Sequence, residues 1–284
     1  MPQRALVLGG GGVLGIAWMT GLTSALAEAG IHLSEADLFV GTSAGSVVGT
    51  QLAFGLPAEM LMAGQQAQGD QPTSYEQYVE MAALNAIYQK WFNAREMTAE
   101  LRRELGQMAL AAGGVPEERY VALFQSVLGD APWPARPLKV TAVDVATGDF
   151  TVWDRDSGVP LPRAIASSCA VPGLFAPITI EGRRYMDGGV RSGTNADLAA
   201  GHERVLVIAP MGSTGHPLGH RQVTAEAEAL RAGGSQVEVV VPDAQTLAVF
   251  GPSLMDSTRR SGSLEAGLRQ GRELAATLRT FWNR

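Results

Sequence analysis

The chain has 284 residues, of which 46% are hydrophobic, so it is long enough for one α/β domain with a sizeable core and is not of disordered composition. Its net charge of −6 argues against a nucleic-acid-binding surface, because binding to a duplex needs a basic excess. Its one cysteine excludes an internal disulfide, and no stretch resembles a signal peptide or a membrane-spanning helix, so the sequence predicts a cytoplasmic protein.

The N-terminal segment is predicted to form a strand–helix–strand unit. The apolar run 5–8 precedes four glycines, helical spacing of apolar residues follows over 15–29, and 38–40 is a second short apolar run. Strands joined in this way are parallel, and the crossover between them is right-handed. The loops that follow the two strands are therefore expected to meet at one edge of a sheet, where open α/β sheets place their sites.

Residues 41–45 after the second strand have the pattern Gly-x-Ser-x-Gly. The glycines Gly41 and Gly45 allow a sharp turn from strand to helix, which would expose Ser43 at the apex. The N-terminus of the following helix would direct amide groups and the positive end of its dipole toward that hydroxyl. Ser43 is therefore a candidate nucleophile, and an ordinary glycine- and serine-rich turn is the alternative.

The glycine loop after the first strand has two interpretations. Gly10, Gly12 and Gly15 match the spacing of a dinucleotide-binding loop, but the second strand lacks the acidic residue that would bind a ribose. Alternatively, the backbone amides of Gly10, Gly11 and Gly12 form an oxyanion hole for a carbonyl attacked by Ser43.

The rest of the chain is predicted to complete the sheet around a helical insertion at about 55–136. This stretch is rich in alanine and methionine, and a helix from Tyr75 to Phe92 is expected to carry an aromatic cluster (Tyr78, Ala82, Tyr88, Trp91 and Phe92) that lines an acyl pocket or an ordinary core. The prolines of 131–137 end the insertion. The further expected elements are strands at 138–143, 150–153, 178–180, 205–208 and 237–241, a short helix at 162–168, and one or two helices over 253–284.

Four motifs in order resemble those of the patatin-like phospholipases. They are the glycine loop at 10–15, the elbow at 41–45, the Ala-Ser-Ser of 166–168 leading to Val-Pro-Gly at 171–173, and Asp187-Gly188-Gly189. The resemblance runs from about Leu6 to Gly189 and is specific only when the motifs are taken together.

This resemblance implies a three-layer α/β/α sandwich with a central, mostly parallel sheet, formed by one domain over 1–284. It implies that Ser43 is the nucleophile, that Asp187 is its general base, and that Gly10, Gly11 and Gly12 form the oxyanion loop. It further implies hydrolysis of lipid acyl esters through an acyl-enzyme, with no metal and no cofactor. Peripheral contact with a membrane stays open, and the sequence predicts no oligomeric state.

The chain departs from the family pattern in two places. Family members usually carry Arg or Lys just before the last glycine of the loop, whereas this chain has Leu14, so the positive charge that would meet a lipid phosphate is missing there. Residues 190–195, after the aspartate, fit the family only loosely.

Three alternatives remain from the sequence. The first is a Ser-His-Asp esterase that uses His202, His216 or His220 as its base. The second is a nucleotide-binding module that uses the glycine loop. The third is a non-catalytic module that binds lipid or a partner.

Overall fold

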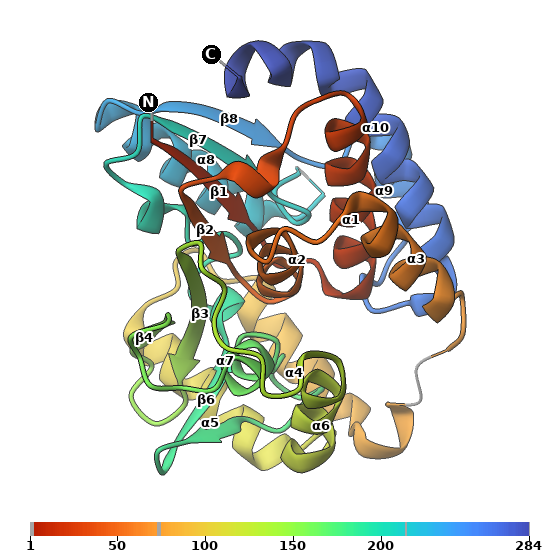
Figure 1. Ribbon diagram of the computed structural model, residues 1–284. Coiled ribbons are helices and arrows are strands. Elements are labelled where there is room, and N and C mark those ends of the chain that lie inside the picture. Colours follow the sequence, from red (N-terminus) through yellow and green to blue (C-terminus); the bar gives the residue numbers. More distant parts are fainter. Residues whose placement is uncertain (1–2, 73–74, 214, 284) are drawn as a thin grey trace.

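An eight-stranded sheet runs through the molecule in the computed structural model, which describes residues 3–72, 75–213 and 215–283 (Figure 1). The strand order is β5-β6-β3-β2-β1-β7-β8, with β4 paired to β3. Strands β1, β2, β3, β7 and β8 are parallel, whereas β4 and β6 run antiparallel to β3 and β5 runs antiparallel to β6. The strands are β1 (Arg4–Leu8), β2 (Leu38–Gly41), β3 (Leu138–Asp144), β4 (Phe150–Trp153), β5 (Ile178–Ile180), β6 (Arg183–Asp187), β7 (Arg204–Ile208) and β8 (Gln236–Val240).

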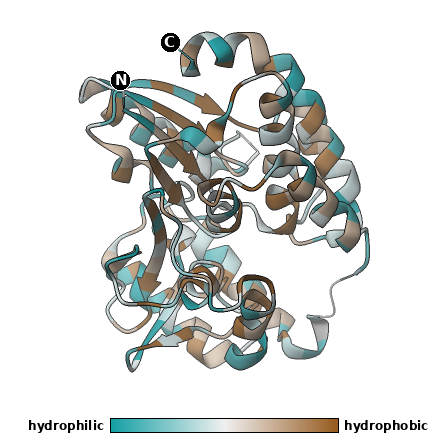
Figure 2. Cartoon of the chain, in the orientation of Figure 1, coloured by the Kyte–Doolittle hydropathy of each residue, from teal (hydrophilic) through white to brown (hydrophobic). Residues whose placement is uncertain are grey.

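Helices cover both faces of this sheet. Because alternate residues of a strand point to opposite faces, Leu6 and Leu8 of β1 pack in the core with α1 and α2, while Val7 packs in the core with α8. Figure 2 shows mostly hydrophobic strands (brown) enclosed by helices that also carry hydrophilic residues (teal) and residues of intermediate hydropathy (white). The predicted three-layer arrangement with a mostly parallel sheet is confirmed. The helices are α1 (Gly12–Glu28), α2 (Ala44–Ala53), α3 (Ala58–Gln68), α4 (Met81–Phe92), α5 (Ala99–Ala112), α6 (Glu117–Leu128), α7 (Leu161–Ser168), α8 (Pro217–Ala232), α9 (Ala244–Phe250) and α10 (Arg260–Trp282).

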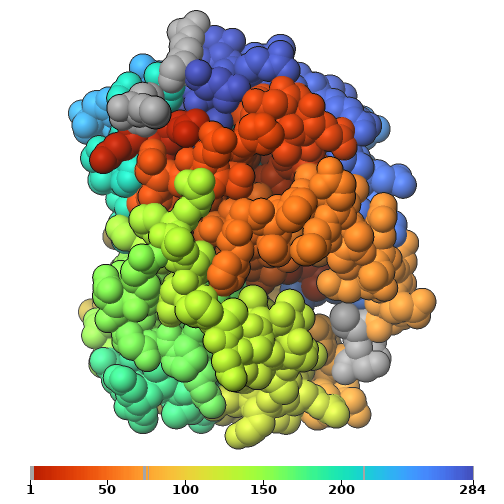
Figure 3. Space-filling model, in the orientation of Figure 1, coloured from red at the N-terminus to blue at the C-terminus, as the bar shows by residue number. Residues whose placement is uncertain are grey.

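The stretch 55–136 contains α3, α4, α5 and α6, as its composition suggested. These helices do not all lie together. α3 packs beside α1, whereas α4, α5 and α6 gather around the β3 end of the sheet. The space-filling view shows the same division, with red, orange and blue segments above and lime and green segments below (Figure 3). The division into one domain with an insertion stays a prediction.

Two predicted helices start at different residues in the structure. The first helix begins at Gly12 rather than at residue 15, so its first turn includes the end of the glycine loop. The helix expected from Tyr75 to Phe92 begins only at Met81, where the Glu80 carboxylate accepts hydrogen bonds from two amides of the first turn. A separate 3₁₀ turn, Glu76–Tyr78, precedes it.

α10 holds α1 in place along most of its length. The two backbones approach closely because Gly21 and Gly267 face one another's helices, and the Ser263 hydroxyl donates to the carbonyl of Leu14 at 2.7 Å. The indole of Trp18 also donates to Gln270 Oε1 at 3.0 Å. α10 therefore fixes the helix that begins in the glycine loop. Within the described residues, no helix combines the length and apolar character needed to cross a bilayer.

Gly267→Ala is expected to destabilise the protein because a Cβ at this position would lie 2.1 Å from the carbonyl oxygen of Trp18. Overpacking of this kind costs about 1–3 kcal/mol of unfolding free energy, measured by chemical denaturation. Gly64→Ala in α3 is the matched control, since a Cβ there meets nothing within 4 Å and should stabilise the helix by about 0.5–1 kcal/mol. Equal stability of the two variants would contradict the close packing of α1 and α10.

Candidate active site

Ser43 occupies a strained turn between β2 and α2. Its φ of 53° and ψ of −121° lie in a region that side-chain-bearing residues rarely adopt. The Ser43 amide donates to Ser168 Oγ at 3.0 Å, and the Ser43 carbonyl accepts from Ser46 Oγ at 2.7 Å. These hydrogen bonds offset the cost of the turn and fix the direction of the Ser43 side chain.

The two elbow glycines provide the space for this turn. A Cβ at Gly45 would lie 1.9 Å from the carbonyl oxygen of Leu8, and a Cβ at Gly41 would lie 2.5 Å from the Cα of Ser46. Real Cβ atoms do not approach backbone atoms so closely. Glycine at residue 45 therefore lets α2 press against the end of β1, and glycine at residue 41 lets the chain turn sharply from β2 into α2.

Asp187 reaches Ser43 through the register of the sheet. Gly41 pairs with Val140 of β3, and Asp187 pairs with Ala142, two residues further along. Ser43 also lies two residues beyond Gly41, so the serine and the aspartate end at the same level of the sheet. The Ser43 hydroxyl lies close enough to the Asp187 carboxyl group to lower the pKa of that group.

The environment of Asp187 makes it an unusually weak acid for an aspartate. Its side chain is only 2% exposed, and burial raises its pKa from 3.8 to about 7. The nearby Ser43 hydroxyl and a hydrogen bond of 2.7 Å from the Gly189 amide to Asp187 Oδ1 act in the opposite direction and lower this pKa. A carboxylate with this pKa can accept a proton near neutral pH.

The glycine loop lies against Ser43, but its amides are not equivalent. A Cβ at Gly10 would lie 3.5 Å from the Cβ of Ser43, yet the Gly10 amide already donates to the carbonyl of Gly193 at 2.8 Å. Among the described residues, the amides of Gly11, Gly12 and Ala44 have no hydrogen-bond partner. The amides left for a ligand are thus those of Gly11 and Gly12, together with Ala44 from the elbow, whereas the Gly10 amide is occupied.

A cavity of about 920 Å³ opens over Ser43, Asp187 and the glycine loop. Its volume lies at the upper end of the range of about 300–1,000 Å³ found for small-molecule sites. α4 lines one wall with Tyr88, Trp91 and Phe92, and α8 contributes Leu218. Tyr78 and Ala82, expected in the same aromatic cluster, are not among the lining residues. The cavity therefore combines an apolar wall with polar and charged residues, among them Arg95, Arg221 and Gln222.

Sequence comparison agrees with this geometry. A sequence model described as patatin-like phospholipase matches residues 6–200, which is more than half of the chain.

The chain belongs to the patatin-like phospholipase family.

Uncharacterized NTE family proteins of Mycobacterium tuberculosis and Mycobacterium bovis are each 29% identical to this patatin-like chain over 208 residues. The matched region covers 69% of this chain and 48% of each relative, so the chain spans about half the length of the curated relatives it matches.

Two solved structures are also similar. VipD from Legionella pneumophila is 14% identical with a TM-score of 0.45, over 98% of this chain and 67% of VipD. The type III effector protein ExoU is 17% identical with a TM-score of 0.40, over 95% of this chain and 53% of ExoU. Both TM-scores are below 0.5, which indicates only a distant structural likeness.

Asn195 organises the loop that follows Asp187 in this patatin-like protein. Its backbone is left-handed, with φ of 50°, and its side-chain nitrogen donates to the carbonyl of Ser192 at 2.8 Å and to Thr42 Oγ1 at 3.0 Å. The carbonyl of Gly188 lies 3.3 Å from the same nitrogen. Asn195 therefore ties the elbow to the segment after the aspartate, although the sequence analysis gave it no role.

Glu226 of α8 braces the same loop from the other side. Its carboxylate accepts from Ser192 Oγ at 2.5 Å, from Thr194 Oγ1 and from the amide of Ala196 at 2.9 Å. Burial raises the pKa of Glu226, and these hydrogen bonds lower it. The helix that carries Glu226 was not predicted, although the spacing of its buried residues (Leu218, Val223, Ala227 and Leu230) is helical.

Of the three candidate histidines, only His216 lines the cavity. Burial lowers its pKa, so it is neutral at pH 7, and no hydrogen bond joins its ring to Ser43 or to a carboxylate in the part of the chain described. The rings of His202 and His220 each contact a backbone carbonyl, of Ala199 at 3.0 Å and of Gly212 at 2.9 Å. This arrangement gives no support to a histidine base.

The one cysteine of the chain, Cys169, and the uncharged loop residue Leu14 are also buried. Burial raises the pKa of the Cys169 thiol, and the charge of Asp187 raises it further, so the thiol stays protonated. Leu14 is fully buried in the core. The described residues contain no cluster of three or more His, Cys, Asp or Glu that could hold a metal ion.

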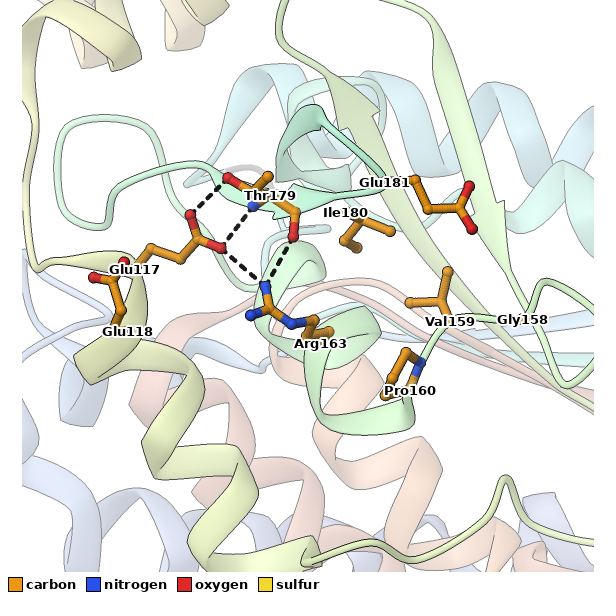
Figure 4. A pocket seen from close by; sticks show the side chains of 9 residues that line it. All are labelled: Glu117, Glu118, Gly158, Val159, Pro160, Arg163, Thr179, Ile180 and Glu181. Atoms are coloured by element: carbon orange, nitrogen blue, oxygen red, sulfur yellow. Dashed lines mark hydrogen bonds and ion pairs between the residues drawn. The ribbon is translucent and has the colours of Figure 1, made fainter.

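A second hollow, of about 480 Å³, lies between α6, α7 and β5 (Figure 4). Its central carboxylate, Glu117, accepts from the amide of Thr179 at 2.9 Å and from its hydroxyl at 2.8 Å, and pairs with Arg163 at 2.9 Å. The hydrogen bonds lower the pKa of Glu117 despite its partial burial. These contacts use the carboxylate to join α6 to β5 and α7, so the hollow has a structural explanation.

Asn195→Asp is expected to lower the unfolding free energy by roughly 2 kcal/mol or more, because a carboxylate would place an acceptor against the buried carbonyls of Ser192 and Gly188. Chemical denaturation at pH 7 measures the change. Asn85→Asp on the exposed face of α4 makes the same chemical change and should stay within about 0.5 kcal/mol of the parent protein. A similar small effect at Asn195 would show that its side chain does not hold the loop.

Proposed function

We propose that this chain is a serine-dependent carboxylic ester hydrolase that acts on lipid acyl esters. The observation that carries the proposal is the proximity of Ser43 to the buried Asp187 in a cavity that also has an apolar wall. Membership of the patatin-like phospholipase family supports the same assignment.

In the proposed reaction, Ser43 Oγ attacks the ester carbonyl while Asp187 takes the hydroxyl proton. A serine hydroxyl is a weak nucleophile unless a neighbouring base accepts this proton. Negative charge then develops on the carbonyl oxygen, in front of the amides of Gly11, Gly12 and Ala44. Preorganised donors of this kind stabilise an oxyanion transition state by about 2.7–4 kcal/mol each.

The tetrahedral intermediate formed by this attack collapses to an acyl-enzyme, and the alcohol leaves with the proton that Asp187 has held. Asp187 next takes a proton from water, which attacks the acyl carbon. The bond from the acyl carbon to Ser43 Oγ then breaks, Asp187 returns the proton to Ser43 Oγ, and the carboxylic acid is released. The aromatic wall of α4 would hold the acyl chain.

We also propose a cytoplasmic location, since the buried, unpaired Cys169 suits a reducing compartment. A peripheral contact with a membrane would bring lipid to the cavity. Phe92 is both a lining residue and 37% exposed, which places an apolar side chain where such lipid would enter.

Ser43→Ala is expected to reduce kcat/KM for a chromogenic acyl ester by at least about 10⁴-fold, because no other nucleophile replaces the hydroxyl. Asp187→Asn should approach the same loss, since an amide cannot take the proton. The measurement is steady-state hydrolysis, together with covalent labelling of Ser43 by a fluorophosphonate probe. Ser126→Ala on the exposed face of α6 is the matched control and should keep the parental rate.

The triple variant with His202, His216 and His220 changed to Ala separates the dyad from a triad. We expect it to lose at most about tenfold in rate and to retain labelling at Ser43. A loss as large as that of Ser43→Ala would favour a histidine base, and full activity of Ser43→Ala would remove the proposal altogether.

The rate is expected to depend on pH through Asp187. Its pKa of about 7 means that kcat/KM should fall about tenfold for each pH unit below 7 and level off above it, because only the carboxylate acts as a base. A flat profile down to pH 5 would contradict this role.

The same shift predicts a change in stability of defined sign. Between pH 4 and 7 the native state holds a proton on Asp187 that the unfolded state has lost, so the unfolding free energy should fall as pH rises through this range. Asp187→Asn removes that decline. Denaturation of both proteins at pH 5 and pH 8 tests the sign, and a parallel response would show that the Asp187 pKa is not raised by folding.

A further inference from the structure

The cavity over Ser43 has a charge opposite to that of the whole chain. The chain carries a net charge of −6, but the charged side chains among its lining residues are Arg95, Arg221 and the deeply buried Asp187. Both arginines are exposed, whereas Asp187 is 2% exposed. The accessible edge of this cavity is therefore cationic.

The two arginines come from different elements that the structure brings together. Arg221 lies on α8, and its Nη2 donates to the carbonyl of Ala94 at 2.9 Å, one residue before Arg95 in the connection between α4 and α5. This bond holds the guanidinium of Arg221 beside the segment that carries Arg95. An anion at this edge of the cavity would be attracted by both guanidinium groups.

Neither arginine has a carboxylate partner in the residues that the structure describes. Some arginines elsewhere pair with acids, as Arg191 does with Asp197 at 2.8 Å and Arg269 does with Asp243 at 2.8 Å, and others, such as Arg136, have no acidic partner among the described residues. Arg95 and Arg221 take part in no such pair, although they line a cavity with an apolar wall. This combination suits an amphiphilic ligand with one anionic end.

We infer that Arg95 and Arg221 form an anion subsite at the edge of the cavity and that the ester substrate carries a phosphate or carboxylate group that binds there. The inference rests on the proposed function and names the substrate class of the same site. A guanidinium presents paired N–H groups that match both anions, and a phosphate offers more acceptor oxygens than a carboxylate.

The inference also accounts for the loss of charge at residue 14. Leu14 is fully buried in the core beneath the glycine loop, so this position presents nothing to a ligand. The positive charge is instead supplied from α8 and from the loop after α4. The aromatic side chains of Trp91 and Phe92 lie just before that loop and line the same cavity. Acyl chain and anion would thus be bound by neighbouring parts of one wall.

Binding of single-chain probes to the Ser43→Ala protein tests the subsite without any hydrolysis. Isothermal titration should show octyl phosphate binding about tenfold or more tightly than octanol, with an affinity that falls as salt is raised. Octanoate distinguishes the source of the anion: weaker binding than octyl phosphate indicates a phosphate-bearing ester, and equal or tighter binding indicates a carboxylate-bearing one. Octanol that binds as tightly as both anions would overturn the subsite.

Substitution assigns the effect to the two arginines. In the same protein, Arg95→Gln and Arg221→Gln should each weaken the binding of octyl phosphate by about threefold to tenfold and change the affinity for octanol much less. Arg221→Lys keeps the charge and should recover part of the loss, which separates charge from the bond to Ala94. Arg136→Gln removes an equally exposed arginine that does not line the cavity, and it should leave the affinity unchanged. Equal effects at residues 95, 221 and 136 would mean that only the net charge matters.

Turnover separates this inference from the proposed function. The unmodified enzyme should show a higher kcat/KM for a monoacylglycerol phosphate than for the monoacylglycerol of the same chain length, and Arg95→Gln should reduce that ratio. If the two esters are instead hydrolysed equally well, or the monoacylglycerol faster, in a reaction that depends on Ser43, a phosphate subsite is overturned. Either result still agrees with the hydrolase assignment. Absence of hydrolysis of either ester counts against the proposed function, and the binding measurements still decide whether the subsite exists.

Discussion

The strained backbone at Ser43 is the constraint on which the rest of the site depends. A residue with a side chain is held in a left-handed conformation because the Ser168 hydroxyl, the Ser46 hydroxyl and the first turn of α2 together satisfy its backbone groups. Relaxation of this turn would swing the hydroxyl away from Asp187. The close approach of α2 to β1, permitted at Gly45, removes the space into which the turn could relax.

Burial and reactivity are linked in the same place. Asp187 loses its water because β6 carries it into the sheet beside β3, and that desolvation raises its pKa toward neutrality. The Ser43 hydroxyl and the Gly189 amide limit the rise. An exposed aspartate would be too weak a base, and one without hydrogen bonds would stay protonated at neutral pH. The fold thus tunes the carboxyl group between these two limits.

The local sequence predicted the elements around the elbow well, because short apolar runs, glycines and turn residues act over a few positions. It also singled out Ser43 and Asp187, which the structure places in contact, while their catalytic roles stay a prediction. β6 was not predicted because its two arginines obscure the strand pattern, and α8 was not predicted because its large apolar residues are few and widely spaced among alanines and polar residues. The cavity wall, the occupied Gly10 amide and the proximity of Arg95 to α8 arise from contacts between distant segments, which no local pattern encodes.

The hydrogen bond from the Gly10 amide to the Gly193 carbonyl joins two main chains rather than two side chains. This contact sets the distance between the glycine loop and the segment beyond Asp187 without using a side chain, whereas the course of that segment depends on the side chains of Ser192, Thr194 and Asn195. Sequence changes on this flank that keep those side-chain hydrogen bonds would leave the centre of the site in place.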